Sequence, residues 1–340
     1  MNKSFFFWLA IGLLFSCEKK TATPYIFSLP AGFKEPLVPR ENPMTREKAA
    51  LGQLLFFDPI LSDDSTIACA SCHAPELAFT DGRKTSTGLQ GRRGKRNAPT
   101  LVNVAYYPYF FSEGKVQDLE TQAQAPGLHE EEMGTKMKDM IYRLRKNTFY
   151  RKKFRQVFHE EIDVKHFVYA LACYERTLIA ANSPYNRFYT TGDSAVLTAD
   201  EKKGMELFFS DRTNCSQCHQ GKLFTNFSFQ NIGLYEWYED PGLARVNSLA
   251  KDSGLFKTPT LLNVAYTAPY MHDGNMATLE DVIEFYNTGG KKHPNKSKWV
   301  KPLGLTEEEK KCLVSFLKTL TDEDLKKGEG IFKKPELSYQ

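Results

Sequence analysis

The chain has 340 residues, of which 41% are hydrophobic and 25% are charged, so it is long enough for two ordinary domains with a large core. Its formal net charge is only +4, and lysine and arginine are scattered along it rather than massed. Nucleic-acid binding is therefore not indicated.

The first residues have the pattern of an export signal. MNKSFFFWLAIGLLFSC contains one lysine and then an apolar run that is too short to span a membrane well. Its last four letters resemble a bacterial lipobox, so we expect residues 1–16 to be a lipoprotein signal peptide and Cys17 to carry the lipid. A plain signal peptide with an incidental cysteine is the alternative. Recurrent prolines in residues 17–43 predict an extended tether, and we expect the protein to face the periplasm from this membrane anchor.

From residue 44 onward the chain contains one unit twice. The segment APTLVNVAYYPYFFSEGKVQDLE aligns without a gap with TPTLLNVAYTAPYMHDGNMATLE, 160 residues further on. Each half begins and ends with an apolar-periodic helix, and Thr198 with Glu201 forms a capping box for one of them. No convincing run of alternating strands is present. We therefore predict a mainly α fold with an N-terminal domain, a C-terminal domain, a tail and an interdomain linker, at residues 44–185, 186–325, 326–340 and 183–196.

Each half carries one Cys-x-x-Cys-His unit, made by Cys69, Cys72 and His73 in the first half and by Cys215, Cys218 and His219 in the second. A structural zinc site needs about four protein ligands, and neither half offers a second such pair. A redox dithiol requires a strand–helix context, which is absent. Covalent c-type haem fits best, because the two thiols add to the haem vinyl groups and the adjacent histidine ligates the iron. We therefore expect two covalently bound haem c groups.

Two further cysteines, Cys173 and Cys312, lie on the apolar faces of predicted helices. A cysteine in this position behaves as a small hydrophobic residue. We predict that both are buried free thiols.

The segments NAPTLVNVAY and TPTLLNVAYTAPYMHDGNMATLEDVIEFYNTGG make the sequence similar to the bacterial dihaem cytochrome c peroxidases and their relatives, the MauG enzymes. The resemblance covers residues 40–320. It implies a cytochrome c fold for each domain and a Ca2+ ion between the domains. It also implies an N-terminal haem that reacts with hydrogen peroxide and a C-terminal haem that relays electrons from an exported donor such as a small cytochrome c. A homodimer remains open.

A peroxidatic iron needs an open coordination position and a nearby base that moves a proton between the peroxide oxygens. In the family pattern this base is a glutamate ten residues after a glutamine, and Gln122 and Glu132 keep that spacing. Glu130 and Glu131 are neighbours, but Glu132 followed by methionine matches the pattern best. A solvated acidic face is the alternative interpretation.

The repeat also predicts that the two irons differ. Tyr286 in the second half corresponds to Pro126 in the first, which offers no side-chain ligand, whereas tyrosine can ligate haem iron. The family places methionine at the Tyr286 position in typical peroxidases and tyrosine in MauG. We expect Tyr286 to occupy the remaining coordination position of the second iron, with Met271 or Met276 as the alternative ligand.

The sequence departs from the typical peroxidases at two places. Leu89 replaces a histidine that blocks the resting N-terminal haem in many of them, so the resemblance implies that no reductive activation is needed. Ser112 begins SEGK where the family has tryptophan between the haems, so electrons must cross elsewhere, and Tyr109, Phe110 and Phe111 are nearby.

The family's calcium site maps onto the side chain of Asn97 and the backbone carbonyls of Thr267 and Pro269. All three supply the oxygen ligands that Ca2+ requires. Without the resemblance, an asparagine before Ala-Pro indicates only a turn.

Three functions remain at this point. The first is a dihaem peroxidase that reduces hydrogen peroxide to water. The second is a MauG-like oxidase that modifies a protein substrate, which Tyr286 and Leu89 favour and the missing tryptophan disfavours. The third is a non-enzymatic dihaem electron-transfer cytochrome, against which Gln122 and Glu132 argue.

Overall fold

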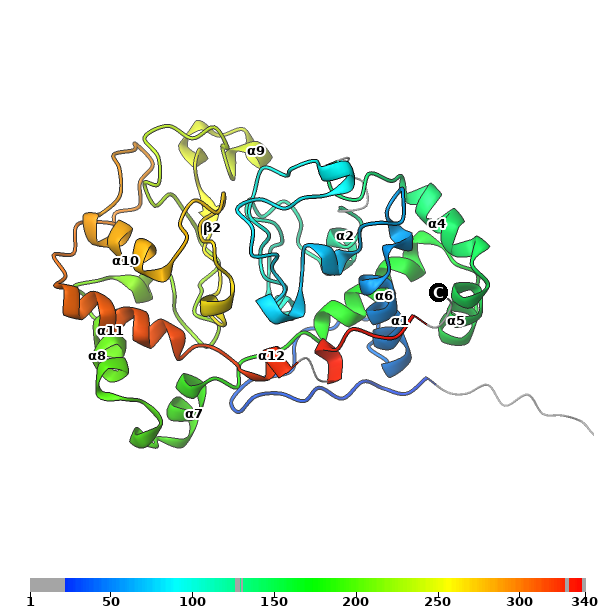
Figure 1. Ribbon diagram of the computed structural model, residues 1–340, viewed down its shortest axis with the longest axis horizontal. Coiled ribbons are helices and arrows are strands. Elements are labelled where there is room, and N and C mark those ends of the chain that lie inside the picture. The colour runs from blue at the N-terminus through cyan, green and yellow to red at the C-terminus, as the bar shows by residue number, and fades with distance from the viewer. Residues whose placement is uncertain (1–21, 126–128, 130, 328–329, 338–340) are drawn as a thin grey trace, which may run out of the picture.

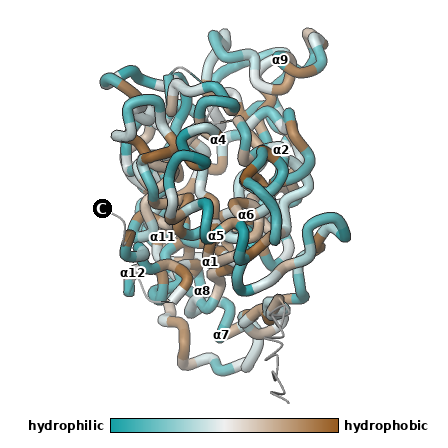
Figure 2. The backbone as a smooth tube through the Cα atoms, turned by 90° about the vertical axis from the view of Figure 1, so that its right-hand side faces the viewer, coloured by the Kyte–Doolittle hydropathy of each residue, from teal (hydrophilic) through white to brown (hydrophobic). Residues whose placement is uncertain are grey.

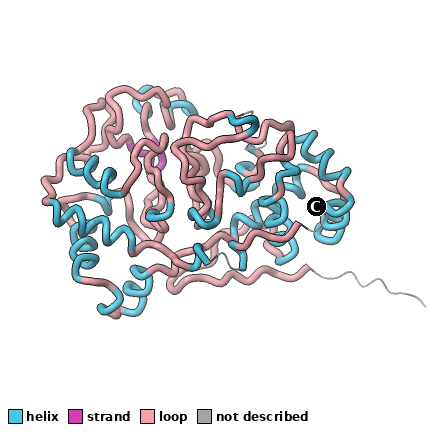
Figure 3. The backbone as a smooth tube through the Cα atoms, in the orientation of Figure 1, coloured by secondary structure: helices cyan, strands magenta, loops and turns pink. Residues whose placement is uncertain are grey.

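The structure is a computed structural model that describes residues 22–125, 129, 131–327 and 330–337. The signal peptide, Cys17 and Pro126 lie outside the described residues. The described chain is mainly helical, with long irregular loops between the helices (Figure 3). The expectation of a mainly α fold is therefore confirmed.

Most of the longer helices lie toward the two ends of the molecule, and long loops with a few short helices fill the middle (Figure 1). The first half contains α1 (Arg46–Phe57), α2 (Leu119–Gln122), α4 (Met137–Lys146), α5 (Thr148–Phe158) and α6 (Val164–Arg176). The second half contains α7 (Pro184–Thr191), α8 (Ala199–Phe208), α9 (Ala244–Asn247), α10 (Leu279–Thr288) and α11 (Glu307–Lys318), followed by α12 (Asp324–Lys327).

Each half has its own hydrophobic core, built around one pair of crossing helices. α1 packs on α6, and α8 packs on α11. A glycine lies at each crossing, because a Cβ atom on Gly52 would collide with the Ala170 carbonyl and one on Gly204 with the Cys312 carbonyl. The two crossings are thus built in the same way, as the repeat in the sequence predicts.

The aligned repeat segments meet at one residue. Asn103 and Asn263 both donate from Nδ2 to the carbonyl oxygen of Ala180, over 3.0 and 3.1 Å. Both asparagines have a left-handed backbone, with φ of 64° and 63°, a conformation that asparagine tolerates better than most residues. These buried side chains tie the two halves together where the chain passes from one to the other.

Several helix starts are visible in the sequence. Thr198 accepts from the backbone N–H of Glu201 over 3.3 Å and the Glu201 carboxylate accepts from that of Thr198 over 2.7 Å, which confirms the capping box. The predicted linker, however, contains α7. Ser183 caps this helix, Pro184 begins it and Gly192 ends it, so ordinary helix signals override a loop-like composition.

The strands were not predicted. β1 (Phe229–Gln230) and β2 (Phe256–Lys257) form a two-stranded antiparallel sheet. Two residues are too few to show the alternation by which a strand is recognised in a sequence.

A segment near each end of the described chain packs against the half that is distant from it in sequence. The segment expected to be a tether reaches the second half, where Phe33 packs on its core, and Tyr106 of the first half donates to the carbonyl of Lys34 over 2.8 Å. The C-terminal segment returns to the first half, where Gln53 donates to the carbonyl of Ile331 over 3.1 Å. Residues 22–43 are therefore held against the protein.

None of the described helices is both long and apolar enough to span a bilayer. Hydrophobic and hydrophilic residues are mixed along the trace (Figure 2).

Candidate active site

Both Cys-x-x-Cys-His units fold into the same local structure. Cys69 and Cys215 each begin a single 3-10 turn. The backbone N–H of His73 donates to the Cys69 carbonyl over 3.0 Å, and that of His219 donates to the Cys215 carbonyl over 2.9 Å. Each histidine is thereby fixed directly behind its pair of cysteines, and all four cysteines are free thiols.

The two histidines are oriented as iron ligands. Nδ1 of His73 lies 2.9 Å from the carbonyl oxygen of Phe79, and Nδ1 of His219 lies 3.0 Å from that of Phe224. A carbonyl only accepts, so Nδ1 carries the proton and Nε2 is left with a free lone pair for a metal. Burial lowers the pKa of both imidazoles, that of His219 to about 4, which keeps them in the neutral, ligating form.

The cysteine pKa values argue against a redox dithiol. Burial raises the pKa of Cys69 to about 12 and that of Cys72 to about 11, whereas a reactive dithiol needs a lowered value. The residues present fit covalent haem: two spaced thiols, a neutral histidine and an Nε2 without a proton.

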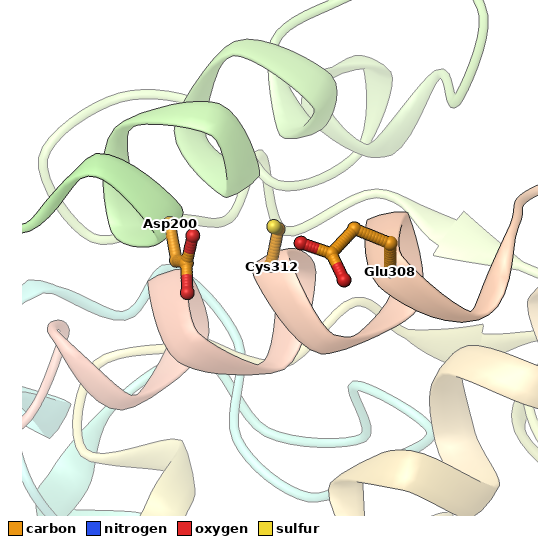
Figure 4. Close-up of side chains that lie close together, drawn as sticks. All are labelled: Asp200, Glu308 and Cys312. Carbon is orange, nitrogen blue, oxygen red and sulfur yellow. The ribbon is translucent and has the colours of Figure 1, made fainter.

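Among the described residues, one group of side chains that could ligate a metal ion lies away from both Cys-x-x-Cys-His units. Asp200 on α8 and Glu308 and Cys312 on α11 have ligand atoms within 4.8 Å of one another (Figure 4). Both acids are exposed, and burial together with the charge of Asp200 raises the pKa of Cys312. A protonated thiol beside solvated carboxylates is a weak metal site. Cys312 and Cys173 are buried free thiols, as predicted.

Glu132 lies beside the first Cys-x-x-Cys-His unit. Its charge contributes to the raised pKa of both Cys69 and Cys72. Burial in turn raises the pKa of the Glu132 carboxyl. Its neighbour Glu131 is exposed, so of these two acids Glu132 is the one held near the cysteines.

Leu89 is held against the backbone of Glu132. It is 4% exposed, and its backbone N–H donates to the Glu132 carbonyl over 2.9 Å. Gly88 has no room for a Cβ atom, because the backbone of Glu131 and Glu132 lies against it. This loop thus presents an apolar side chain and supports the Glu132 backbone.

Gln122 ends α2, which Asp118 caps. Its Oε1 atom is buried and accepts no hydrogen bond from any described residue. A buried amide oxygen without a partner is costly in a finished structure, so a ligand is expected to supply the missing donor.

Tyr286 on α10 approaches the second Cys-x-x-Cys-His unit. Burial raises its pKa, with further contributions from the thiols of Cys215 and Cys218. Met276 instead lines an open surface cavity with residues of α10 that include Asp281 and Glu284. These acids lie on the exposed side of α10, away from Tyr286.

The region of the expected calcium site brings the two halves together. The backbone N–H of Asn97 donates to the carbonyl of His272 over 2.9 Å, and the carbonyls of Thr267 and Pro269 accept no hydrogen bond within the described chain. Asp273 adds a buried carboxylate oxygen, Oδ1, that is also without a partner there. This oxygen was not predicted; the repeat pairs Asp273 with Glu113 but does not show that either lies near this region.

Aromatic rings connect the two halves near the position of the missing tryptophan. The rings of Tyr107 and Phe227 have centroids 5.0 Å apart, and those of Tyr109 and Phe229 are 5.9 Å apart. Phe227 directly follows Asn226, whose backbone N–H donates to the carbonyl of Cys218 over 2.9 Å. One side of this bridge therefore reaches the second Cys-x-x-Cys-His turn.

Lys257 lies between the two ring pairs. Its ammonium donates to the Tyr109 carbonyl over 2.6 Å and lies 4.8 Å from the centre of the Tyr107 ring. Burial lowers the pKa of Lys257 to about 8. Of the aromatic residues considered from the sequence, Tyr109 takes part in the bridge, whereas Phe110 is buried in the core of the first half.

An ion-pair cluster holds the same interface. Arg96 in the first half binds Glu113 and also Asp240 in the second half. Its guanidinium lowers the pKa of Asp240 to about 2. Because these charges are part-buried, dissolved salt weakens their attraction less than it weakens that of an exposed ion pair.

Comparisons with known proteins agree with this geometry. A family model described as di-haem cytochrome c peroxidase matches residues 46–195. The MauG protein of Methylorubrum extorquens is 37% identical over 288 residues, covering 84% of this chain and 81% of its own. The cytochrome c551 peroxidase of Nitrosomonas europaea is 33% identical over 320 residues, covering 89% and 92%.

Among solved structures, a MauG-like protein associated with microbial copper homeostasis superposes with a TM-score of 0.86 at 33% identity, covering 92% of this chain and 99% of that one. Peroxidases and MauG proteins are thus both among the relatives. The chain belongs to the di-haem cytochrome c peroxidase family, which is a family of oxidoreductases.

Proposed function

We propose that this protein is a dihaem peroxidase that reduces hydrogen peroxide to water. The peroxide would react at a haem held by Cys69, Cys72 and His73, and electrons would arrive through a haem held by Cys215, Cys218 and His219. The observation that carries the proposal is the part-buried carboxyl of Glu132 at the first unit. The second unit instead has a tyrosine, Tyr286, beside it, so the two sites differ.

Bound haem would supply an iron that accepts a peroxide oxygen and passes on electrons. Glu132 would then remove the proton from one peroxide oxygen and deliver it to the other, which makes that oxygen a good leaving group. Its raised pKa brings the carboxyl nearer to the operating pH, where a group exchanges protons in both directions most readily.

Gln122 would orient the peroxide, because its free amide oxygen can accept a hydrogen bond from a hydroxyl group. Leu89 offers no ligand atom, so its loop would leave the first iron open in every redox state. Tyr286 would be a ligand of the second iron through its phenolic oxygen, which would suit that haem to electron transfer.

Between the haems, we infer that the ring pairs Tyr107–Phe227 and Tyr109–Phe229 take the place of the absent tryptophan. Ca2+ would be bound by Asn97, Thr267 and Pro269, and within the described chain the carbonyls of Thr267 and Pro269 are free to bind it. The electron donor would be a small cytochrome c or another exported carrier, and the protein would be lipid-anchored at Cys17 and face the periplasm.

A MauG-like oxidase is the second candidate. It would use the same first haem to oxidise a side chain of a partner protein. Tyr286 favours it, because tyrosine stands at this position in MauG and methionine in typical peroxidases.

The deciding experiment measures steady-state reduction of hydrogen peroxide with reduced cytochrome c as donor, started from fully oxidised and from half-reduced enzyme. A peroxidase with an open first haem turns over at the same initial rate from both states. A lag that pre-reduction abolishes contradicts the role given to Leu89, and the absence of turnover from both states contradicts the peroxidase.

A further inference from the structure

Glu175 is a buried acid that the proposed mechanism does not use. It lies one residue before the end of α6 and is 5% exposed. Its Oε2 atom has no hydrogen-bond partner among the described residues. Burial raises its pKa to about 8, because a carboxylate loses more than a neutral acid when it leaves water.

The adjacent arginine does not neutralise this carboxyl through a direct bond. Arg176 binds both carboxylate oxygens of Glu120 on α2, over 2.7 and 2.8 Å, and Asn42 donates to the same carboxylate over 2.8 Å. The titratable groups that interact with Glu175 are Arg176 and Tyr174 on its own helix, Glu120 on α2, and Cys69.

Glu175 directly follows Tyr174, which belongs to the hydrophobic core against which Cys69 packs. After burial itself, the charge of Glu175 is the largest contribution to the raised pKa of Cys69. Once Cys69 is a thioether it no longer titrates, and the haem that it holds would be exposed to the same charge.

The second half has no acid at the equivalent position. The crossings at Gly52 and Gly204 pair Ala170 with Cys312, and five residues further along the two helices this pairs Glu175 with Leu317. Leu317 is also 5% exposed. A leucine satisfies the packing there, so the carboxyl of Glu175 is not needed to fill the space.

We propose that Glu175 links the redox state of the haem at Cys69, Cys72 and His73 to the binding of one proton. When the donor's electron reduces ferric iron to ferrous iron at this site, the Glu175 carboxylate takes up one proton from solvent and becomes a neutral acid. Oxidation by one electron releases that proton again. This inference rests on haem attachment in the first half, as the proposed function states, and does not require peroxide turnover.

The sign of the linkage follows from electrostatics. A negative carboxylate stabilises the oxidised, more positive iron, and a neutral acid does not. The reduction potential of the first haem should therefore fall as the pH rises. If one proton is bound per electron, the equilibrium constant for reduction changes at most tenfold per pH unit. This corresponds to a change in reduction potential of about 59 mV per pH unit.

The test is a spectroelectrochemical titration of the full-length dihaem protein at a series of pH values. We expect the potential of the first, high-spin haem to fall with pH in the wild type, and this slope to be lost in Glu175→Gln and in Glu175→Leu, which copies the second half. The second haem of each molecule is the internal control and should keep its own slope. Glu132→Gln is the matched control for the other carboxyl near Cys69, and it should keep the slope of the first haem.

A wild-type potential without pH dependence overturns the inference, as does a slope that survives in Glu175→Gln or disappears in Glu132→Gln. If the Glu175 variants do not bind haem, redox-difference infrared spectra of the wild type and of Glu132→Gln decide. Both should show a change in the carbonyl stretch of a protonated carboxyl group, and its absence from either overturns the inference. An intact slope without peroxide turnover would contradict the peroxidase and leave this linkage standing.

Discussion

Replacing Glu132 by glutamine removes a proton carrier and leaves its surroundings almost unchanged. The side chain keeps its size, and the bond from the Leu89 N–H to the residue 132 carbonyl is a backbone interaction that the substitution does not touch. Haem content and the resting spectrum should therefore stay as in the wild type.

The effect on turnover follows from the role of the carboxyl. General acid–base catalysis typically contributes at least about 10²-fold, so kcat/KM for hydrogen peroxide should fall by roughly that factor or more. This corresponds to about 2.7 kcal/mol of transition-state stabilisation. The assay is steady-state peroxide reduction with reduced cytochrome c, and Glu131→Gln, at the exposed neighbour, should retain wild-type turnover.

The same carboxyl should set the acid limb of the pH profile. Glu132 acts as a base only when it is deprotonated, and its pKa is raised by burial. In the wild type, kcat/KM should fall as the pH is lowered through this raised pKa, above the ordinary range of glutamate near 4.3, and Glu132→Gln should lose that limb. Near-wild-type turnover in Glu132→Gln would remove the residue from the mechanism.

The other predictions concern the second haem, the bridge and the calcium site. Tyr286→Phe should change the low-spin electron paramagnetic resonance signal while haem content is kept, and an unchanged signal would return the ligand role to Met271 or Met276. Phe227→Leu should slow electron equilibration between the haems, measured by stopped-flow after adding one electron equivalent, because it removes a ring contact of 5.0 Å; an unchanged rate refutes the bridge. Asn97→Ala should lower the Ca2+ content measured by atomic emission, and equal content in variant and wild type places the ion elsewhere.

The positions of the two Cys-x-x-Cys-His turns and the starts of several helices could be predicted because their signals are local. Cys69, Cys72 and His73 are adjacent in sequence, and the capping box at Thr198 is complete within four residues. The repeat extended this information over a long distance, since it related Tyr286 to the first half and led to the expectation of two different irons.

The features that escaped prediction depend on long-range packing. Nothing near Glu175 in the sequence distinguishes a buried acid from an exposed one, and its burial depends on α1, α2 and the Cys69 turn meeting in space. Asp273 likewise becomes a candidate calcium ligand only because the Asn97 segment of the other half packs beside it. The Tyr107–Phe227 contact joins residues from different halves and has no signature in either.

The central claim is that one iron is open and the other is closed. Electron paramagnetic resonance of the resting, fully oxidised dihaem protein tests it most directly. The account predicts one high-spin haem, at the site of Cys69, Cys72 and His73, and one low-spin haem at the other site, in equal amounts. Two low-spin haems would contradict the open site and support an electron-transfer cytochrome instead.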